Sequence, residues 1–181
     1  MCNHPKNPTR RRLLQLGASA MVVLPALPAL ATAKPQVATV LDLPKPGFRD
    51  ACPVCGMFPE KYPDWVATVL FKDGHADHFD GAKDMFKYLH DMPKYASGRK
   101  QDQIAAIGVT GYYAAEMIDA RQAIYVIGSD VLGPMGHELV PHPDMYDAEA
   151  FFVDHAGVKM VRFEETTTAM MHGLDEGRFD L

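Results

Sequence analysis

Residues 65–90 read WVATVLFKDGHADHFDGAKDMFKYLH, and their pattern of apolar and turn-forming residues gives the clearest indication of secondary structure in the chain. It opens with an apolar, β-branched run, and a second short apolar run covers residues 76–79. The Asp73-Gly74 pair between the runs predicts a tight hairpin turn, because these residues tolerate the backbone conformation of such turns. Residues 81–92 carry apolar side chains at helical spacing, and Pro93 ends that pattern. The sequence therefore predicts a strand, a turn, a strand and a helix in this order.

The same order of elements returns in the second half of the chain. The elements expected there are a strand at 123–129, a turn at 133–136, a return strand at 137–141, a helix at 144–156 and a strand at 158–163. Asp144 or Asp147 is the expected N-cap of this helix, since a short carboxylate accepts hydrogen bonds from free backbone N–H groups. A strand at 104–110 closes the first half in the same way. The fold class is therefore α+β, with two ββαβ units forming one compact domain.

The first 33 residues have the composition of an export signal. They hold four basic residues, among them Arg10, Arg11 and Arg12, and no acidic residue. An apolar run at 13–30 follows and closes with the small residues Ala31-Thr32-Ala33. The arginines before the leucines predict export by a twin-arginine signal and a periplasmic location. An uncleaved membrane anchor is the alternative, because about 20 apolar residues can span a bilayer. No lipobox cysteine follows the run.

The rest of the chain divides by composition into three parts. Proline-rich residues 34–51 predict an extended linker, residues 52–163 the domain itself, and residues 164–181 a C-terminal helix and tail. Removal of residues 1–33 leaves 148 residues and changes the net charge from −5 to −9. This acidic balance excludes nucleic acid as a partner, since phosphate backbones select basic surfaces. The common catalytic signatures are missing, which predicts that the chain is not an enzyme.

Cys52-Pro53-Val54-Cys55-Gly56-Met57 places three sulfur atoms within six residues. Thiolate and thioether ligands select Cu(I) over harder ions, and the proline and glycine indicate a tight loop that can gather the sulfurs around one metal. Three alternatives stay open at this motif. They are a structural disulfide, a thioredoxin-like redox pair, which belongs at a helix N-terminus, and a structural zinc site, which usually needs four ligands.

Met135 is the second candidate ligand, because Pro134 and Gly136 place it at the tip of a turn rather than on a buried stripe. The neighbouring His137 could add a nitrogen ligand, and His142 lies close in the sequence. Weaker ligand candidates are His75, His78 and the Met170-Met171-His172 cluster. This cluster lies in a helix expected at 164–172, which frays after Gly173. Asp80, Asp119 and Arg121 are expected to form a charge network.

These motifs occur in an order that resembles the NosL family of nitrous-oxide reductase accessory proteins. The residues that carry the resemblance are Cys52–Met57, Pro59, Tyr62-Pro63, the Asp-Gly hairpin, His78-Phe79-Asp80, Ile118–Arg121, Ala123–Gly128 and Gly133–Gly136. They cover nearly the whole domain from Cys52 to Phe163. Each motif alone is modest, and their combination is specific.

The resemblance implies an exported Cu(I)-binding chaperone with a fold related to the organomercurial lyase MerB. The family pattern of Cys, three variable residues, Gly and Met falls on Cys52 and Met57, and a later family methionine falls on Met135. Cys55 then becomes an auxiliary ligand, and His137 a further candidate. The implied partners are nitrous-oxide reductase or another copper-accepting enzyme, and a membrane transporter. Many family members are lipoproteins, so the missing lipobox is a departure.

Two enzymatic alternatives compete with the chaperone. The runner-up is a thiol-disulfide oxidoreductase that uses Cys52 and Cys55, and it predicts a depressed pKa for one thiol. A carbon–mercury lyase needs an acid placed by the fold beside a cysteine pair, and the spacing in the sequence gives this alternative little support.

Overall fold

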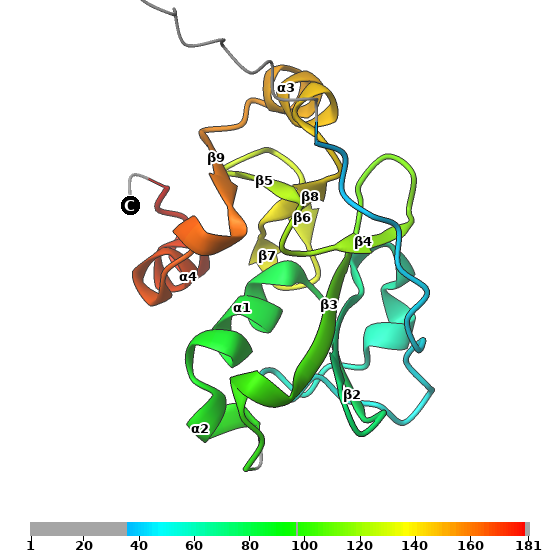
Figure 1. Cartoon of the computed structure of the whole chain (residues 1–181). Coiled ribbons are helices and arrows are strands. Elements are labelled where there is room, and N and C mark those ends of the chain that lie inside the picture. Colours follow the sequence, from blue (N-terminus) through cyan, green and yellow to red (C-terminus); the bar gives the residue numbers. More distant parts are fainter. Residues whose placement is uncertain (1–35, 97, 180–181) are drawn as a thin grey trace, which may run out of the picture. The chain divides into compact units, whose positions relative to one another are not determined.

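The computed structural model describes residues 36–96 and 98–179 (Figure 1). The helices are α1 (Ala82–His90), α2 (Met92–Tyr95), α3 (Met145–Asp154) and α4 (Thr168–Asp175). The strands are β1 (Ala67–Phe71), β2 (Ala76–Phe79), β3 (Ile104–Thr110), β4 (Met117–Asp119), β5 (Ile124–Ile127), β6 (Leu132–Gly133), β7 (Gly136–His137), β8 (Val140–His142) and β9 (Lys159–Arg162). The predicted export signal at 1–33 lies outside the described residues.

Two antiparallel sheets repeat the same strand order. The first sheet runs β2-β1-β3-β4 and the second β8-β5-β9, so in each unit the first strand lies between the second and the last. A helix precedes the last strand in both units, α1 before β3 and α3 before β9. The hairpin of β6 and β7 is inserted between the first two strands of the second unit. The predicted α+β fold with two ββαβ units is therefore confirmed.

Two helix boundaries differ from the sequence prediction. Pro93 does not end the helical region but lies in the first turn of α2, where a missing N–H costs nothing. The C-terminal helix begins at Thr168 rather than near residue 164, because the Thr167 hydroxyl caps it by accepting from the Met170 N–H at 3.1 Å. Gly173 is buried inside α4 and does not mark the start of fraying.

The larger hydrophobic core joins α1 and α4 to the inner faces of β1 and β3. Met85 and Phe86 on α1 are buried in it, together with Met170 and Met171 on α4. Figure 1 shows α1 and α4 next to each other and close to the hairpin of β6 and β7. This packing brings the end of β2, the start of α1 and the hairpin of β6 and β7 close to one another.

The segment at 36–51, predicted as a linker, is extended and hydrogen-bonded along β4. The Leu41 N–H donates to the Met117 carbonyl at 2.8 Å, and the Asp119 N–H donates to the Thr39 carbonyl at 2.8 Å. In the part of the chain that the structure describes, no helix has the length and apolarity needed to cross a membrane.

Candidate metal site

The sulfur motif folds into a tight turn just before the first sheet. The Cys52 N–H donates to the Met57 carbonyl at 2.7 Å, and the Gly56 N–H donates to the Cys52 carbonyl at 2.9 Å. Gly56 has a φ of 78°, a left-handed conformation that glycine adopts without strain. These bonds hold both cysteines on one compact loop, and both are free thiols.

Two carboxylates from the first ββαβ unit meet these thiols. The Cys55 thiol donates to Asp80 Oδ1 at 3.1 Å, and the Cys52 thiol donates to Asp84 Oδ2 at 3.6 Å. One ligand atom from each of the four residues lies within 4.8 Å of the others. Asp80 follows the end of β2 and Asp84 lies in the first turn of α1, so the strand-to-helix junction places both carboxylates.

Sequence reasoning did not assign either carboxylate to the metal site. Asp80 was expected in a charge network with Asp119 and Arg121, and that prediction is wrong for Asp80, which faces the Cys55 thiol. Asp119 instead accepts from the Arg121 N–H at 2.9 Å in a local turn. The signal that could have revealed Asp80 is its position immediately after a buried strand, where the chain turns into a helix.

The surroundings keep both thiols protonated at neutral pH. Burial raises the pKa of the Cys52 thiol from 9.0 to about 12, and the charges of Asp84 and Asp80 act in the same direction. Burial is also the largest cause that raises the pKa of Cys55, and its hydrogen bond to Asp80 adds to the effect. A metal that binds these sulfurs as thiolates must therefore displace their protons.

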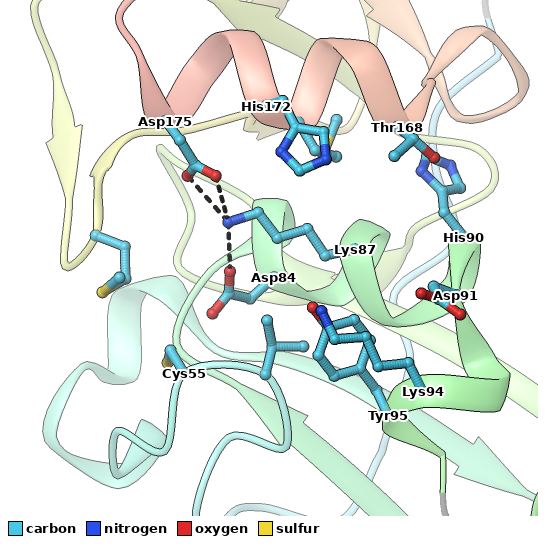
Figure 2. Close-up of a pocket in the computed structure, with 13 residues that line it drawn as sticks. Cys55, Asp84, Lys87, His90, Asp91, Lys94, Tyr95, Thr168, His172 and Asp175 are labelled. Atoms are coloured by element: carbon cyan, nitrogen blue, oxygen red, sulfur yellow. Dashed lines mark hydrogen bonds and ion pairs between the residues drawn. The ribbon is translucent and has the colours of Figure 1, made fainter.

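A cavity of about 450 Å³ opens beside the thiols. Cys55 and Asp84 line it on one side, and Met135, His172 and Asp175 line it from the hairpin and α4. Figure 2 shows the Lys87 ammonium between the carboxylates of Asp175 and Asp84, at 2.9 Å and 3.3 Å. The cavity therefore has a sulfur-lined part and a part lined by paired charges.

The structure brings some of the sequence-predicted candidates together. Met135 sits at the tip of the hairpin, is 41% exposed and lines the same cavity as Cys55. Met57 is half-buried on the loop with the cysteines. His137 is not among the residues that line this cavity, and its ring packs edge-on against Phe179 with centroids 4.8 Å apart.

Two further methionine candidates and His142 are buried, whereas His172 is exposed at the cavity and His75 is exposed elsewhere. Met170 and Met171 are buried in the larger core, which explains their position on α4 as packing rather than ligation. His142 is fully buried among aromatic rings that include Tyr112 and Phe151, and neither ring nitrogen has a hydrogen-bond partner among the described residues. It does not line the cavity beside the thiols.

The buried imidazole of His142 is expected to lower the free energy of unfolding as the pH falls below 6.5. Burial lowers the pKa of His142 from 6.5 to about 4, so protonation favours the unfolded chain over this range. The contribution is complete above pH 6.5 and is lost as the pH falls toward 4, which amounts to about 3 kcal/mol. We expect the free energy of unfolding, measured with a chemical denaturant, to decrease between pH 7 and pH 4 by about 3 kcal/mol more in the wild type than in His142→Phe. The exposed His75→Phe is the control, and parallel profiles for wild type and His142→Phe would contradict the expectation.

We expect the hydrogen bond to Asp80 to lower the reactivity of the Cys55 thiol. Asp80→Asn removes the negative charge that lies next to the Cys55 thiol and leaves the burial of that thiol unchanged. The thiolate of Cys55 therefore becomes easier to form. We expect alkylation of Cys55 by iodoacetamide at pH 8 to become about tenfold faster, as measured by tandem mass spectrometry of the peptide that holds both cysteines. Asp91→Asn, at the same cavity but without a hydrogen bond to either thiol, should leave the rate unchanged. An unchanged rate in Asp80→Asn would show that burial alone controls this thiol.

The donor set has the chemistry of a soft-metal site. The Cys55 thiol and the thioether of Met135 border one cavity, and the buried Cys52 thiol lies in the same cluster as Cys55. Sulfur donors of these kinds favour monovalent copper. The carboxylates are hard donors that hold the thiol protons in the metal-free form. The arrangement can accept a soft cation from the cavity side.

Comparison with known proteins places this arrangement in a family. The family model described as NosL matches residues 46–171. The copper-binding lipoprotein NosL of Stutzerimonas stutzeri is 27% identical over 135 residues, which cover 67% of this chain. The chain spans 64% of the length of that relative.

One solved structure of a related protein agrees with this placement. The crystal structure of the copper chaperone NosL from Shewanella denitrificans superimposes with a TM-score of 0.59 at 27% identity, covering 71% of this chain and 97% of that one. The solution structure of the apo-NosL protein from Achromobacter cycloclastes has a TM-score of 0.38 at 25% identity, covering 58% and 87%. The chain belongs to the NosL family.

Proposed function

We propose that this chain is an exported metallochaperone that carries Cu(I) as its cargo. The observation that carries the proposal is the pair of free thiols within 4.8 Å of each other, beside a cavity that Met135 also lines. Sulfur donors of this kind suit monovalent copper and suit no common hard cation. The copper-binding and copper-chaperone relatives support the same cargo.

In this proposal Cys52, Met57 and Met135 are the principal ligands and Cys55 is the auxiliary one. The two cysteines and Met57 share one hydrogen-bonded loop, whereas Met135 comes from the β6–β7 hairpin and lines the same cavity as Cys55. Binding through His137 would require its ring to leave Phe179, so we place it outside the resting ligand set.

An open shell suits a carrier rather than a catalyst or a storage site. The cavity leaves one side of the sulfur cluster accessible, so a ligand from an acceptor protein can attack the bound ion before the chaperone has released it. Four strong ligands in a closed shell would hold the ion against transfer, as they do in structural zinc sites. The chain therefore acts by binding and transfer, without a catalysed reaction of its own.

We further propose that the chain transfers copper in the periplasm to nitrous-oxide reductase or a related copper enzyme. A membrane transporter assists this transfer. The basis is the motif resemblance together with the composition of residues 1–33, which is typical of twin-arginine export. The test is to mix the copper-loaded chain with copper-free nitrous-oxide reductase and to measure copper in the separated enzyme. Retention of all copper by the chaperone would exclude this acceptor.

The thiol environment argues against the redox alternative. Thiol-disulfide exchange needs a thiolate, and redox-active pairs have a depressed pKa at a helix N-terminus. Here burial raises the pKa of both cysteines, and they lie on a turn that a short 3-10 helix at Pro59–Lys61 follows, rather than at the N-terminus of an α-helix. The carboxylates beside the cysteine pair do meet one requirement of a carbon–mercury lyase, so release of hydrocarbon from a phenylmercury salt is a useful additional assay.

The decisive experiment is an anaerobic titration of the purified, reduced protein with Cu(I) in the presence of a chromophoric Cu(I) chelator. We expect one tightly bound Cu(I) per chain and an X-ray absorption spectrum dominated by sulfur neighbours. Failure to compete with the chelator, or a spectrum with only nitrogen and oxygen neighbours, would remove the proposed function. Rapid reduction of insulin disulfides by the same preparation would favour the oxidoreductase.

A further inference from the structure

Lys83 is a lysine with no exposed side chain, which is rare for this residue type. Its ammonium donates to the main-chain carbonyl of Met135 at 2.8 Å and lies 3.2 Å from Asp175 Oδ1. Removing an ammonium from water is costly unless polar partners replace the water. The partners of Lys83 belong to two elements distant in sequence, so its burial depends on their meeting at this point.

These partners connect the parts that surround the cavity. Lys83 lies in the first turn of α1, next to Asp84, which accepts from the Cys52 thiol. Met135 is at the tip of the β6 and β7 hairpin, and Asp175 is the last residue of α4. A single side chain therefore links the helix behind the cysteine loop to the turn that carries the distant methionine.

The hairpin needs an anchor of this kind. Its ladder consists of only two residue pairs, Leu132 with His137 and Gly133 with Gly136, and such short hairpins are not stable alone. Glu138 fixes the base, because its carboxylate accepts from the Lys83 N–H at 2.9 Å and fits closely over Gly81, where an added Cβ would lie 2.5 Å from Oε1. The ammonium of Lys83 fixes the tip.

The contact to the tip is made through the backbone. Lys83 binds the main-chain carbonyl of Met135, and Met135 is 41% exposed at the cavity that Cys55 lines. An apolar residue at position 83 could fill the same space but could not hold this carbonyl. The interaction therefore orients a side chain without covering its sulfur.

We infer that Lys83 is a positioning residue that holds the Met135 turn beside the cavity that Cys55 lines, so that the Met135 thioether can bind copper together with the cysteine loop. This inference rests on the proposed function, in which Met135 is a ligand. Lys83 itself does not touch the ion. If Lys83 acts by positioning, its substitution changes copper affinity only when Met135 is present as a ligand. A general contribution of Lys83 to stability would not depend on Met135.

A double-mutant cycle tests whether the effect of Lys83 on Cu(I) affinity depends on Met135. The affinity is measured by anaerobic competition with a chelator. We expect Met135→Leu to lower the affinity about tenfold, and Lys83→Met to lower it about tenfold in the wild type but less than twofold in the Met135→Leu background. Lys87→Met is the matched control, because Lys87 also contacts Asp175 but has no hydrogen bond to Met135. Its effect should be equal in both backgrounds.

Hydrogen exchange of the copper-free protein provides a second readout. Lys83→Met should speed amide exchange at residues 132–137 about tenfold and leave β1 and β3 unchanged, whereas a general loss of stability would speed exchange in all of them. Lys83→Gln, which keeps one donor group, should give intermediate values in both measurements.

Several results would overturn the inference. They are an unchanged affinity in Lys83→Met, an equal loss in both Met135 backgrounds, or failure of both Lys83 variants to fold, which would make Lys83 a core-stabilising residue. If the wild type binds no Cu(I), or if Met135→Leu has no effect, the ligand assignment fails instead. The exchange data then still decide whether Lys83 anchors the hairpin.

Discussion

Cys52→Ser is expected to lower the Cu(I) affinity about a thousandfold, which corresponds to about 4 kcal/mol. Cys52 is buried at the base of the loop, and its backbone closes the turn through hydrogen bonds in both directions. A serine of nearly the same size preserves this turn but replaces a soft thiolate with a hydroxyl that binds Cu(I) poorly. The change therefore removes a ligand while it leaves the loop in place.

Cys55→Ser is the matched comparison, since both variants alter one sulfur on the same loop. We expect it to lower the affinity less, because Cys55 is the auxiliary ligand in the proposed set. The measurement is anaerobic competition with a Cu(I) chelator, with circular dichroism to show that each variant is folded. Equal binding by the wild type and Cys52→Ser would eliminate Cys52 as a ligand.

The apparent Cu(I) affinity is expected to rise steeply with pH. Burial raises the pKa of Cys52 to about 12 and also raises the pKa of Cys55, so both sulfurs carry protons at pH 6–8 in the metal-free chain. Each proton released on binding increases the affinity about tenfold per pH unit. Binding through both thiolates therefore predicts an increase of about 10,000-fold between pH 6 and pH 8, and binding through one predicts about 100-fold.

Competition titrations at several pH values, corrected for titration of the chelator itself, measure this slope. The Cys55→Ser variant supplies the control, because it can release only one thiol proton. An affinity independent of pH in the wild type would contradict binding as thiolates, since no protons would then be displaced.

Much of the fold could be predicted because its signals are local. The Asp73-Gly74 turn and the β-branched run before it predict the hairpin, and β3 has the predicted bounds Ile104–Thr110. Asp144 caps α3 as expected, since its carboxylate accepts from the Asp147 N–H at 3.0 Å. The end of α1 was harder to predict, because a proline also fits the first turn of the next helix.

The candidate site could be predicted only where its residues are close in sequence. The cysteine loop is visible as a motif, and the turn around Met135 is visible from its glycines and proline. The carboxylates of Asp80 and Asp84 were not assigned to the site, because their proximity to the thiols comes from the packing of α1 and β2 against the loop. The role of Lys83 was also hidden, since a lysine in a helix usually faces water.

The hydrogen bonds from the thiols to Asp80 and Asp84 also bear on how long the metal-free protein would survive in the proposed exported location. Thiolates attack peroxides and disulfides, whereas the neutral S–H groups that donate to Asp80 and Asp84 are poor nucleophiles. An exported protein meets an oxidising environment, in which an exposed thiolate pair is readily lost to oxidation. If the chain carries copper as proposed, protonation of both sulfurs protects the metal-free form until a metal with high sulfur affinity displaces the protons.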